Sequence, residues 1–377
     1  MSAIVESDFI VIGGGIAGAC IAYWLAPHAR VVILERETHP GYHSTGRSAA
    51  LFLETYGPPA VRALTRASRA FLQDPPPGFT EHPLLTPRGG LVVAEEGQED
   101  KLEAYWDEVR ASTTVTRRLD REQTCHLVPV LRPERVLGSV FEPEGCDLDV
   151  HALHQGYLRA LRRQGGTIQC DTEVVAIARE SQGWSVNAGD RVYRAPVVVN
   201  ASGAWADVVA GMAGVSRLGI EPRRRSAFVF PSPPDTDVTA WPAVFGAGDD
   251  WYFKPDAATL LASPSNADLV EPHDVQAEEL DIAMAIERIE AVTTLAIRRP
   301  TRVWAGLRTF VADGGVAGGF DERAPGFFWL AALGGYGIQI SAALGEACAA
   351  LARGMPLPQR LADFGLSAGM LSPARLR

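Results

Sequence analysis

Residues 8–18 have the sequence DFIVIGGGIAG. The run Asp8–Ile12 is short and mostly apolar, as in a buried strand, and the glycines after it lead into Ile16–Ala26, which has helical character. A second apolar run, Val31–Leu34, ends at Glu35. This order predicts a strand–helix–strand unit of a parallel α/β sheet, with a glycine-rich turn at the carboxyl end of its first strand.

The glycine spacing in this turn, Gly13-x-Gly15-x-x-Gly18, is typical of dinucleotide binding. Gly13 permits the tight turn, Gly15 leaves room for a pyrophosphate, and Gly18 lets the helix pack on its strand. The helix N-terminus offers free N–H groups to phosphates, and Glu35 can accept hydrogen bonds from a ribose. We therefore predict a dinucleotide site here; a purely structural turn is the alternative.

Length and composition limit the remaining possibilities. At about 150 residues per domain, a chain of 377 residues with 47% apolar and 21% charged residues should form two to three packed domains. The net charge of −10 gives no electrostatic footprint for nucleic acid or an anionic membrane surface. Only Lys101 and Lys254 are lysines, so chemistry that needs a lysine has two candidates.

The cysteines and the apolar runs of the sequence indicate the cellular compartment in which the protein is expected. The five cysteines form no CxxC pair, which argues against a disulfide framework or a metal site and favours a reducing compartment. The run Phe9–Leu25 follows Glu6 and Asp8 instead of basic residues, so it does not resemble a signal peptide. We expect no transmembrane segment and a location in the cytoplasm, or peripheral at the inner membrane.

Strand–glycine–helix junctions recur near the start, the middle and the end of the chain, with sheet-like segments between them. The later two lie around Val197–Gly203 and Phe327–Arg353. We therefore predict a mixed α/β fold in which residues 1–57, 148–222 and 301–377 form a nucleotide-binding domain. Residues 58–147 and 223–300 would form an interleaved substrate domain.

Seven strings of residues point to a known family. They are GYHSTGRSAA (Gly41–Ala50), EHPLL (Glu81–Leu85), ALHQGYLRA (Ala152–Ala160), RRSAF (Arg224–Phe228), KPDA (Lys254–Ala257), WAGLR (Trp304–Arg308) and GGYGIQ (Gly334–Gln339). With them the chain resembles, over nearly its whole length, the D-amino acid oxidase (DAO) family of flavin-dependent oxidoreductases, and within it most of all the bacterial D-arginine dehydrogenases. The resemblance implies a Rossmann-like FAD-binding domain and an antiparallel-sheet substrate domain, as in p-hydroxybenzoate hydroxylase.

The resemblance also implies where FAD would lie. Glu35 and Arg36 would hold the adenosine and pyrophosphate end, Val174 the adenine, and Ser44–Ala50 would lie beside the isoalloxazine ring. A helix that begins near Ile338 would direct its N-terminus at the flavin pyrimidine, where charge builds on reduction. The complete expected set is Gly13, Gly15, Ala17, Gly18, Glu35, Arg36, Ser44, Thr45, Gly46, Arg47, Ser48, Ala49, Ala50, Val174, Gly203, Gly334, Gly335, Tyr336, Gly337, Ile338 and Gln339. FAD should be non-covalent, because Cys348, the only cysteine in the last third, stands in an alanine-rich core helix.

Four residues match the substrate-binding positions of the family. Arg308 would hold the substrate carboxylate with its guanidinium fork, and Tyr252 would add a phenol hydrogen bond. Arg225 and Tyr56 match further pocket positions. Tyr252 could instead be a core aromatic, and we expect Arg223 and Arg224 to form a solvated basic cluster.

Two departures from the family bear on specificity. Gly90 stands where a D-arginine enzyme has the glutamate that pairs with the substrate guanidinium, and Leu51 stands where it has a histidine. With Leu53, Ile338 and Gln339 completing the pocket, we predict a wider, more apolar pocket for an apolar or aromatic side chain.

The resemblance implies oxidative deamination of a D-amino acid: Cα gives a hydride to flavin N5, and the imino acid hydrolyses to the 2-oxo acid and ammonia. Oxidation of a secondary amino acid and a non-catalytic flavoprotein subunit are the alternatives. We expect a quinone or carrier as electron acceptor instead of dioxygen. The strand Thr259–Ser263 carries Leu260 and Leu261 where oxidases of the family have a lysine, and Lys254 is expected near a turn.

Overall fold

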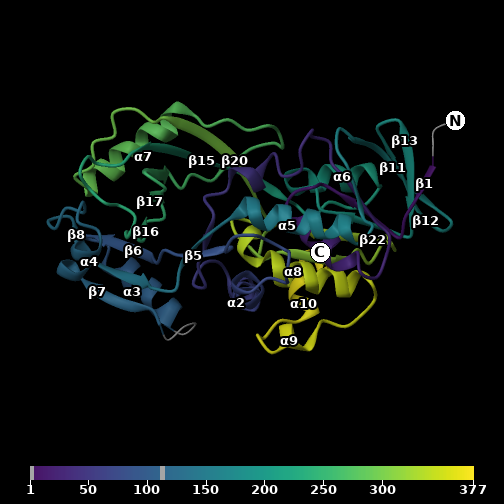
Figure 1. Cartoon of the computed structure of the whole chain (residues 1–377), viewed down its shortest axis with the longest axis horizontal. Helices are drawn as coiled ribbons and strands as arrows, with labels where there is room; N and C mark the ends of the chain where they lie inside the picture. Colours follow the sequence, from purple (N-terminus) through teal and green to yellow (C-terminus); the bar gives the residue numbers. More distant parts are fainter. Residues whose placement is uncertain (1–3, 111–114) are drawn as a thin grey trace.

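A six-stranded sheet forms the centre of the part that carries the N-terminus, at the right of the computed structural model, which describes residues 4–110 and 115–377 (Figure 1). The strand order is β10 (Thr167–Gln169), β3 (Val31–Leu34), β2 (Phe9–Ile12), β14 (Val197–Asn200), β22 (Phe327–Ala331) and β21 (Ala317–Phe320). The first five strands are parallel and β21 is antiparallel to β22. The predicted parallel sheet is therefore present.

Both faces of this sheet are buried, because alternate residues of its apolar strands point to opposite sides. On one face lie α1 (Ile16–Leu25), α5 (Val150–Arg163) and α8 (Gly337–Ala352), with α2 (Pro59–Gln73) packed on α8. On the other lie α6 (Ala206–Met212) and a sheet of β1 (Ile4–Glu6), β13 (Arg191–Ala195), β12 (Gly183–Ala188) and β11 (Val174–Glu180). The carboxyl ends of β2, β3 and β14 remain open for a site.

A nine-stranded sheet forms the other part, at the left of Figure 1. Its strands are β19 (Asp268–Leu269), β15 (Glu221–Pro231), β18 (Thr259–Ser263), β17 (Tyr252–Asp256), β16 (Ala243–Gly246), β6 (Gly90–Glu95), β8 (Val136–Glu142) and β7 (Arg117–Asp120), with β20 (Arg302–Phe310) paired to β15. All pairings are antiparallel except β16 with β6. Helix α7 (Glu279–Val292) packs on β15 and β18, while α3 (Glu99–Arg110) and α4 (Arg121–Leu127) pack near β6, β7 and β8.

A small sheet lies between the two parts. It consists of β4 (Leu51–Phe52), β9 (Cys146–Leu148) and β5 (Leu85–Pro87). The short helices α9 (Gln359–Ala362) and α10 (Ala368–Leu371) follow α8. Within the described residues, no helix combines the length and apolar character needed to cross a bilayer.

The predicted mixed α/β fold class is confirmed, whereas the exact domain division stays a proposal. All strands of the six-stranded sheet fall inside the three segments proposed for the nucleotide domain. Two elements pack against the domain to which they are not assigned: β20 pairs with β15 in the larger sheet, and α2 packs on α8. Both contacts join segments far apart in the sequence, which local patterns do not reveal.

Candidate active site

The glycine turn after β2 has the geometry that its sequence predicts. Gly13 has φ +103°, and a Cβ on it would lie 2.6 Å from the carbonyl oxygen of Ala201. A Cβ on Gly18 would lie 1.9 Å from the carbonyl oxygen of Gly13, so α1 can approach β2 only because residue 18 is glycine. Helix α1 begins without a side-chain cap at Gly15. Thr45 accepts the N–H of Ile16, and the other N–H groups of this first turn remain available to an anion.

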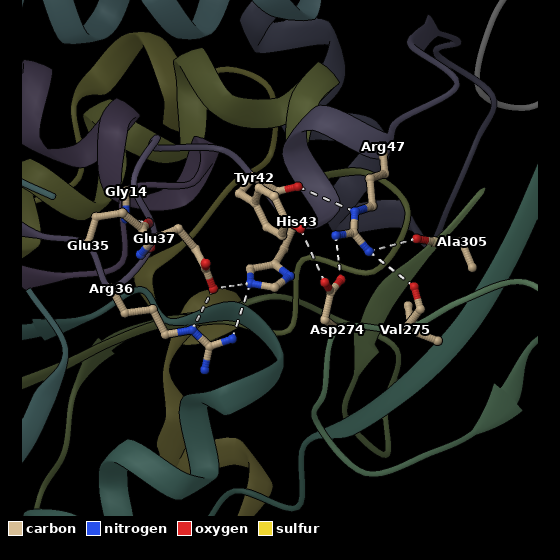
Figure 2. Close-up of polar contacts among 10 residues, drawn as sticks. All are labelled: Gly14, Glu35, Arg36, Glu37, Tyr42, His43, Arg47, Asp274, Val275 and Ala305. Atoms are coloured by element: carbon tan, nitrogen blue, oxygen red, sulfur yellow. Dashed lines mark hydrogen bonds and ion pairs between the residues drawn. The ribbon is translucent and has the colours of Figure 1, made fainter. Parts of the chain in front are cut away.

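Glu35 closes the adenosine end of this turn. Its side chain is 8% exposed, and its two oxygens accept hydrogen bonds from the backbone N–H groups of Gly14 (2.8 Å) and Glu37 (2.9 Å). Figure 2 shows the carboxylate beside Gly14. Each carboxylate oxygen has a second lone pair, so Glu35 can still accept ribose hydroxyls.

A polar cluster that the sequence analysis did not identify lies next to Glu35 (Figure 2). Glu37 Oε1 lies 2.8 Å from His43 Nε2 and 2.9 Å from Arg36 Nε. The guanidinium of Arg36 lies 3.9 Å from the ring centroid of Trp205, which follows β14 in the turn η2 (Gly203–Trp205). Burial alone would raise the pKa of Glu37, but hydrogen bonds from His43 and Arg36 hold it below its usual value. The cluster joins the loops after β3 and β14 across the open end of the sheet.

The loop expected beside the flavin is a 3-10 turn, η1 (Ser44–Arg47), tied to both parts of the molecule. Thr45 Oγ1 accepts the N–H of Ile16 at 3.0 Å, and Ser44 Oγ donates to the carbonyl of Leu307 at 2.6 Å. Arg47 forms an ion pair with Asp274 at 2.5 Å and, as Figure 2 shows, also reaches the carbonyl oxygens of Val275 and Ala305. The loop is therefore held in place on both sides.

The turn before α8 forms the far wall of the site. Gly334 has φ +51°, and α8 begins after Tyr336 without a side-chain cap. A Cβ on Gly335 would lie 2.8 Å from Arg308 Nη1 and 2.9 Å from the hydroxyl of Tyr56. The N-terminus of α8 and these two side chains thus meet at one place.

Strand register places the substrate-binding candidates on one side of the nine-stranded sheet. Arg225 of β15 pairs with Gly306 of β20, which lies two residues before Arg308. Tyr252 of β17 pairs with Phe245 of β16. Phe245 in turn pairs with Val92 of β6, which lies two residues after Gly90. The two sets are linked through β18, because Leu261 pairs with Val229, four residues after Arg225, and with Lys254, two residues after Tyr252. Because paired and alternate residues share a face, Arg225, Arg308, Tyr252 and Gly90 lie on the same side. We call it the cofactor-facing side.

Arg224 lies on the opposite side of the sheet. Its exposure is 8%, and it forms ion pairs with Asp268 and Asp281, each at 3.2 Å. The expectation that Arg224 is solvated was therefore wrong, because strand alternation turns it toward α7.

Arg308 and Arg225 form a cationic end to the cavity. Arg308 Nη1 donates a hydrogen bond to the hydroxyl of Tyr56 at 3.1 Å. Within residues 4–110 and 115–377, neither arginine has an ion-pair partner, and the buried Nε of Arg225 has no hydrogen-bond partner. Burial and the charge of Arg308 lower the pKa of Arg225. Burial acts to lower the pKa of Arg308 as well, but Tyr56, Tyr252 and Asp249 together raise it above its usual value. Two cations that have no ion-pair partner among the described residues are suited to an anionic ligand.

Three of the predicted pocket residues form a packed group instead of lining the cavity. Gln339 is 3% exposed; its Oε1 accepts the N–H of Leu53 at 3.1 Å and its Nε2 donates to Thr65 Oγ1 at 2.9 Å. Leu53 covers Gly90, where an added Cβ would lie 2.8 Å from Leu53 Cδ2. The surroundings of Gly90 are apolar, as expected. The expected extra width is absent, because Leu53 occupies the space that the lack of a side chain at position 90 would leave.

Lys254 lies near a turn, as expected: β17 ends at Asp256 and residues 257–258 form the turn to β18. It lies within β17, 5% exposed, and its Nζ lies 2.6 Å from Asp147 Oδ1. Lys254 shares the cofactor-facing side with Tyr252, two residues before it, and pairs with Leu261. The sequence did not reveal its buried ion pair.

A continuous cavity connects the adenosine end to the two arginines. It is lined by Gly13, Gly15, Ala17, Glu35, Arg36, His43, Ser44, Thr45, Arg47, Ser48, Ala49, Val174, Gly203, Trp205, Arg225, Tyr252, Arg308, Gly334, Gly335, Gly337 and Ile338, among others. Gly18, Gly46, Ala50, Leu51, Leu53, Tyr56, Gly90, Tyr336 and Gln339 are absent from its lining. A glycine turn for a pyrophosphate, an acid for a ribose and a helix N-terminus for a flavin fit FAD along this cavity.

Comparisons with known proteins agree with this site. The family model described as FAD dependent oxidoreductase (DAO) matches residues 8–351. FAD-dependent oxidoreductase domain-containing protein 1 of Bos taurus is 25% identical over 403 residues, covering 91% of this chain and 80% of that protein. L-2-hydroxyglutarate dehydrogenase of Escherichia coli K12 is 24% identical over 226 residues, covering 57% of this chain and 50% of that protein.

Solved structures show the same fold. Glycine oxidase from Geobacillus kaustophilus has a TM-score of 0.83 and 22% identity, covering 97% of this chain and 99% of its own. Iminodiacetate oxidase from Chelativorans has a TM-score of 0.81 and 21% identity, covering 97% and 98%. The particular similarity to D-arginine dehydrogenases stays a prediction. The family match over most of its length shows that the chain belongs to the DAO family of FAD-dependent oxidoreductases, with FAD as its cofactor.

Proposed function

We propose that this oxidoreductase oxidatively deaminates a D-amino acid with an apolar or aromatic side chain to the 2-oxo acid and ammonia. The observation that supports it best is the pair Arg308 and Arg225, which face the cavity beside Tyr252 and have no acidic ion-pair partner within the described residues. A substrate carboxylate would supply the missing anion. A cytoplasmic location and a quinone or carrier as electron acceptor belong to the same proposal.

The residues of the chain have separate tasks in this reaction. Arg308 binds the carboxylate through its guanidinium fork, and the hydroxyl of Tyr252 adds a hydrogen bond to it, so that Cα is fixed in orientation. Bound FAD supplies the acceptor for the hydrogen that leaves Cα as hydride. The free N–H groups at the start of α8 stabilise the negative charge that accompanies reduction.

A secondary amino acid is the alternative substrate, because the same arginines would bind its carboxylate. The test is anaerobic bleaching of the yellow flavin by a panel of D-, L- and N-methyl amino acids. We expect fast bleaching by D-amino acids. Faster bleaching by N-methyl or cyclic substrates would establish the alternative, and no bleaching by any member would contradict both proposals.

We predict that FAD is bound without a covalent link. Cys348 is fully buried in α8. Its Sγ faces Gly318 of β21, where an added Cβ would lie 2.6 Å from it, so the thiol points into the core. The described residues that line the cavity include no cysteine. Acid precipitation should release all yellow colour into the supernatant, and colour that stays in the pellet would contradict the prediction.

We also predict that dioxygen is a poor electron acceptor. Leu261 lies on the cofactor-facing side, and the nearby cation, Lys254, is bound by Asp147. A cation exposed to the flavin would favour the negatively charged oxygen intermediate. Lys254 instead binds Asp147, which also pairs with Arg88, and Lys254 does not line the cavity. Turnover with phenazine methosulfate should exceed peroxide formation in air by at least about tenfold; equal rates would identify an oxidase.

A further inference from the structure

We propose that Leu53 is the specificity-determining residue of the substrate pocket: it closes the pocket over Gly90 and Gly145 and selects short aliphatic side chains over aromatic ones. The proposal rests on the proposed function, since it concerns which amino acid the same site oxidises. It narrows the apolar substrate class to its smaller members.

The position of Leu53 in the chain places it at the substrate. It comes directly after β4, the strand that follows the loop beside the flavin, and three residues later Tyr56 contacts Arg308. Its side chain lies over Gly90, which shares the cofactor-facing side of the sheet with Tyr252 and Arg308. Leu53 therefore belongs to the segment that leads from the loop beside the flavin to Tyr56, and it covers Gly90 on the cofactor-facing side.

Leu53 fills the space that two glycines leave free. A Cβ on Gly90 would lie 2.8 Å from Leu53 Cδ2, and a Cβ on Gly145 would lie 2.7 Å from the same atom. Leu53 is 8% exposed. Arg225, Tyr252 and Arg308 line the cavity, whereas Leu53 and the Gly90 that it covers lie behind this lining. A substrate side chain that extends toward Gly90 would meet this leucine.

Two buried side chains hold the segment that carries Leu53. The amide of Gln339 accepts from the N–H of Leu53 at 3.1 Å and donates to its carbonyl oxygen at 3.3 Å. Glu142, 5% exposed, accepts the N–H of Glu54 at 2.7 Å and the hydroxyl of Thr55. With its backbone bound on both sides, Leu53 forms a fixed wall that a large substrate cannot displace at low cost.

The test compares kcat/KM for D-alanine, D-leucine and D-phenylalanine in the FAD-loaded wild type, Leu53→Ala and Leu53→Phe. A change of a few methylene groups in an apolar pocket alters selectivity by about tenfold or more. The wild type should therefore prefer D-alanine and D-leucine to D-phenylalanine by at least about tenfold. Leu53→Ala should raise the ratio of D-phenylalanine to D-alanine by a similar factor, and Leu53→Phe should lower the ratio of D-leucine to D-alanine.

Leu72→Ala is the matched control, because it also shortens a fully buried leucine but in α2, within the core around α8. It should leave all three ratios unchanged. A wild type that prefers D-phenylalanine, or a Leu53→Ala variant with normal FAD content and unchanged ratios, would overturn the proposal. If Leu53→Ala fails to retain FAD, Leu53→Val provides the same comparison with a smaller change.

Failure of the proposed function gives a different result. In that case no amino acid bleaches the flavin in any variant, and binding of propionate and phenylacetate can be followed through the flavin absorption spectrum. Leu53→Ala should then strengthen phenylacetate binding relative to propionate by about tenfold. An unchanged ratio would contradict the role of Leu53 independently of any turnover.

Discussion

In an Arg308→Ala variant, kcat/KM should fall by at least about 100-fold while FAD content stays unchanged. The guanidinium lies at the end of the cavity, it has no ion-pair partner among the described residues, and it donates a hydrogen bond to the hydroxyl of Tyr56. Its removal takes away a charged, two-pronged contact to the substrate carboxylate, worth roughly 3 kcal/mol. The glycine turn and the loop Ser44–Arg47, which we expect to hold FAD, are untouched.

Two further variants separate charge from position. Arg308→Lys keeps the charge but loses the planar fork, so it should recover only part of the rate. Arg223→Ala is the control, because Arg223 is the backbone partner of Arg308 in the neighbouring strand and its side chain forms an ion pair with Glu221 at 2.7 Å. This variant should leave kcat/KM unchanged. Normal kinetics in Arg308→Ala with full FAD content would mean that the substrate carboxylate binds elsewhere.

D-Arginine should be a poorer substrate than D-leucine by about 10³-fold in kcat/KM, because a buried cation without a counter-ion costs several kcal/mol. Position 90 is glycine, and the two nearest candidate acids are already bound. Glu54 forms an ion pair with Arg69 at 2.5 Å, and Glu142 accepts hydrogen bonds from Glu54 and Thr55. Burial also raises the pKa of Glu142, which weakens it as a counter-ion.

The matched comparison for this prediction is D-lysine against D-2-aminoheptanoic acid, whose side chains have the same length and differ only in the terminal group, an ammonium in one and a methyl in the other. D-2-Aminoheptanoic acid should be oxidised faster, and the ratio of kcat/KM should approach that of D-leucine to D-arginine. Because the side chains have the same length, the wall formed by Leu53 affects both members of the pair equally. Preference for D-lysine or D-arginine would show that another carboxylate serves the pocket, and Glu54→Gln would then test the first candidate.

The glycine turn could be predicted from the sequence because its determinants are local. The positive φ of Gly13 and the close approach of α1 at Gly18 depend on residues within one strand–helix unit. The same holds for the start of α8 after Gly334–Gly335, where a strand, two glycines and a helix follow in order. Hydrophobic periodicity and turn chemistry act over a few residues, so one sequence contains enough information about them.

The cluster of Arg36, Glu37, His43 and Trp205 was missed for the opposite reason. Trp205 follows a strand–glycine junction, Ala201-Ser202-Gly203, which was the available signal, but nothing local indicates that Arg36 lies over its ring at 3.9 Å. The contact arises because β3, β2 and β14 are neighbours in the sheet, which brings their following loops together.

By itself the sequence determined the parallel α/β unit, the dinucleotide turn and, through its resemblance to a family, the residues expected at the two ends of FAD. Only the tertiary structure decided that Lys254 is bound by Asp147, that Leu53 lies over Gly90, and that Gln339 holds Leu53. Each of these contacts joins segments from different elements, and strand register sets which side chains meet. Register depends on the packing of the whole sheet, so it cannot be derived from the period of any one strand.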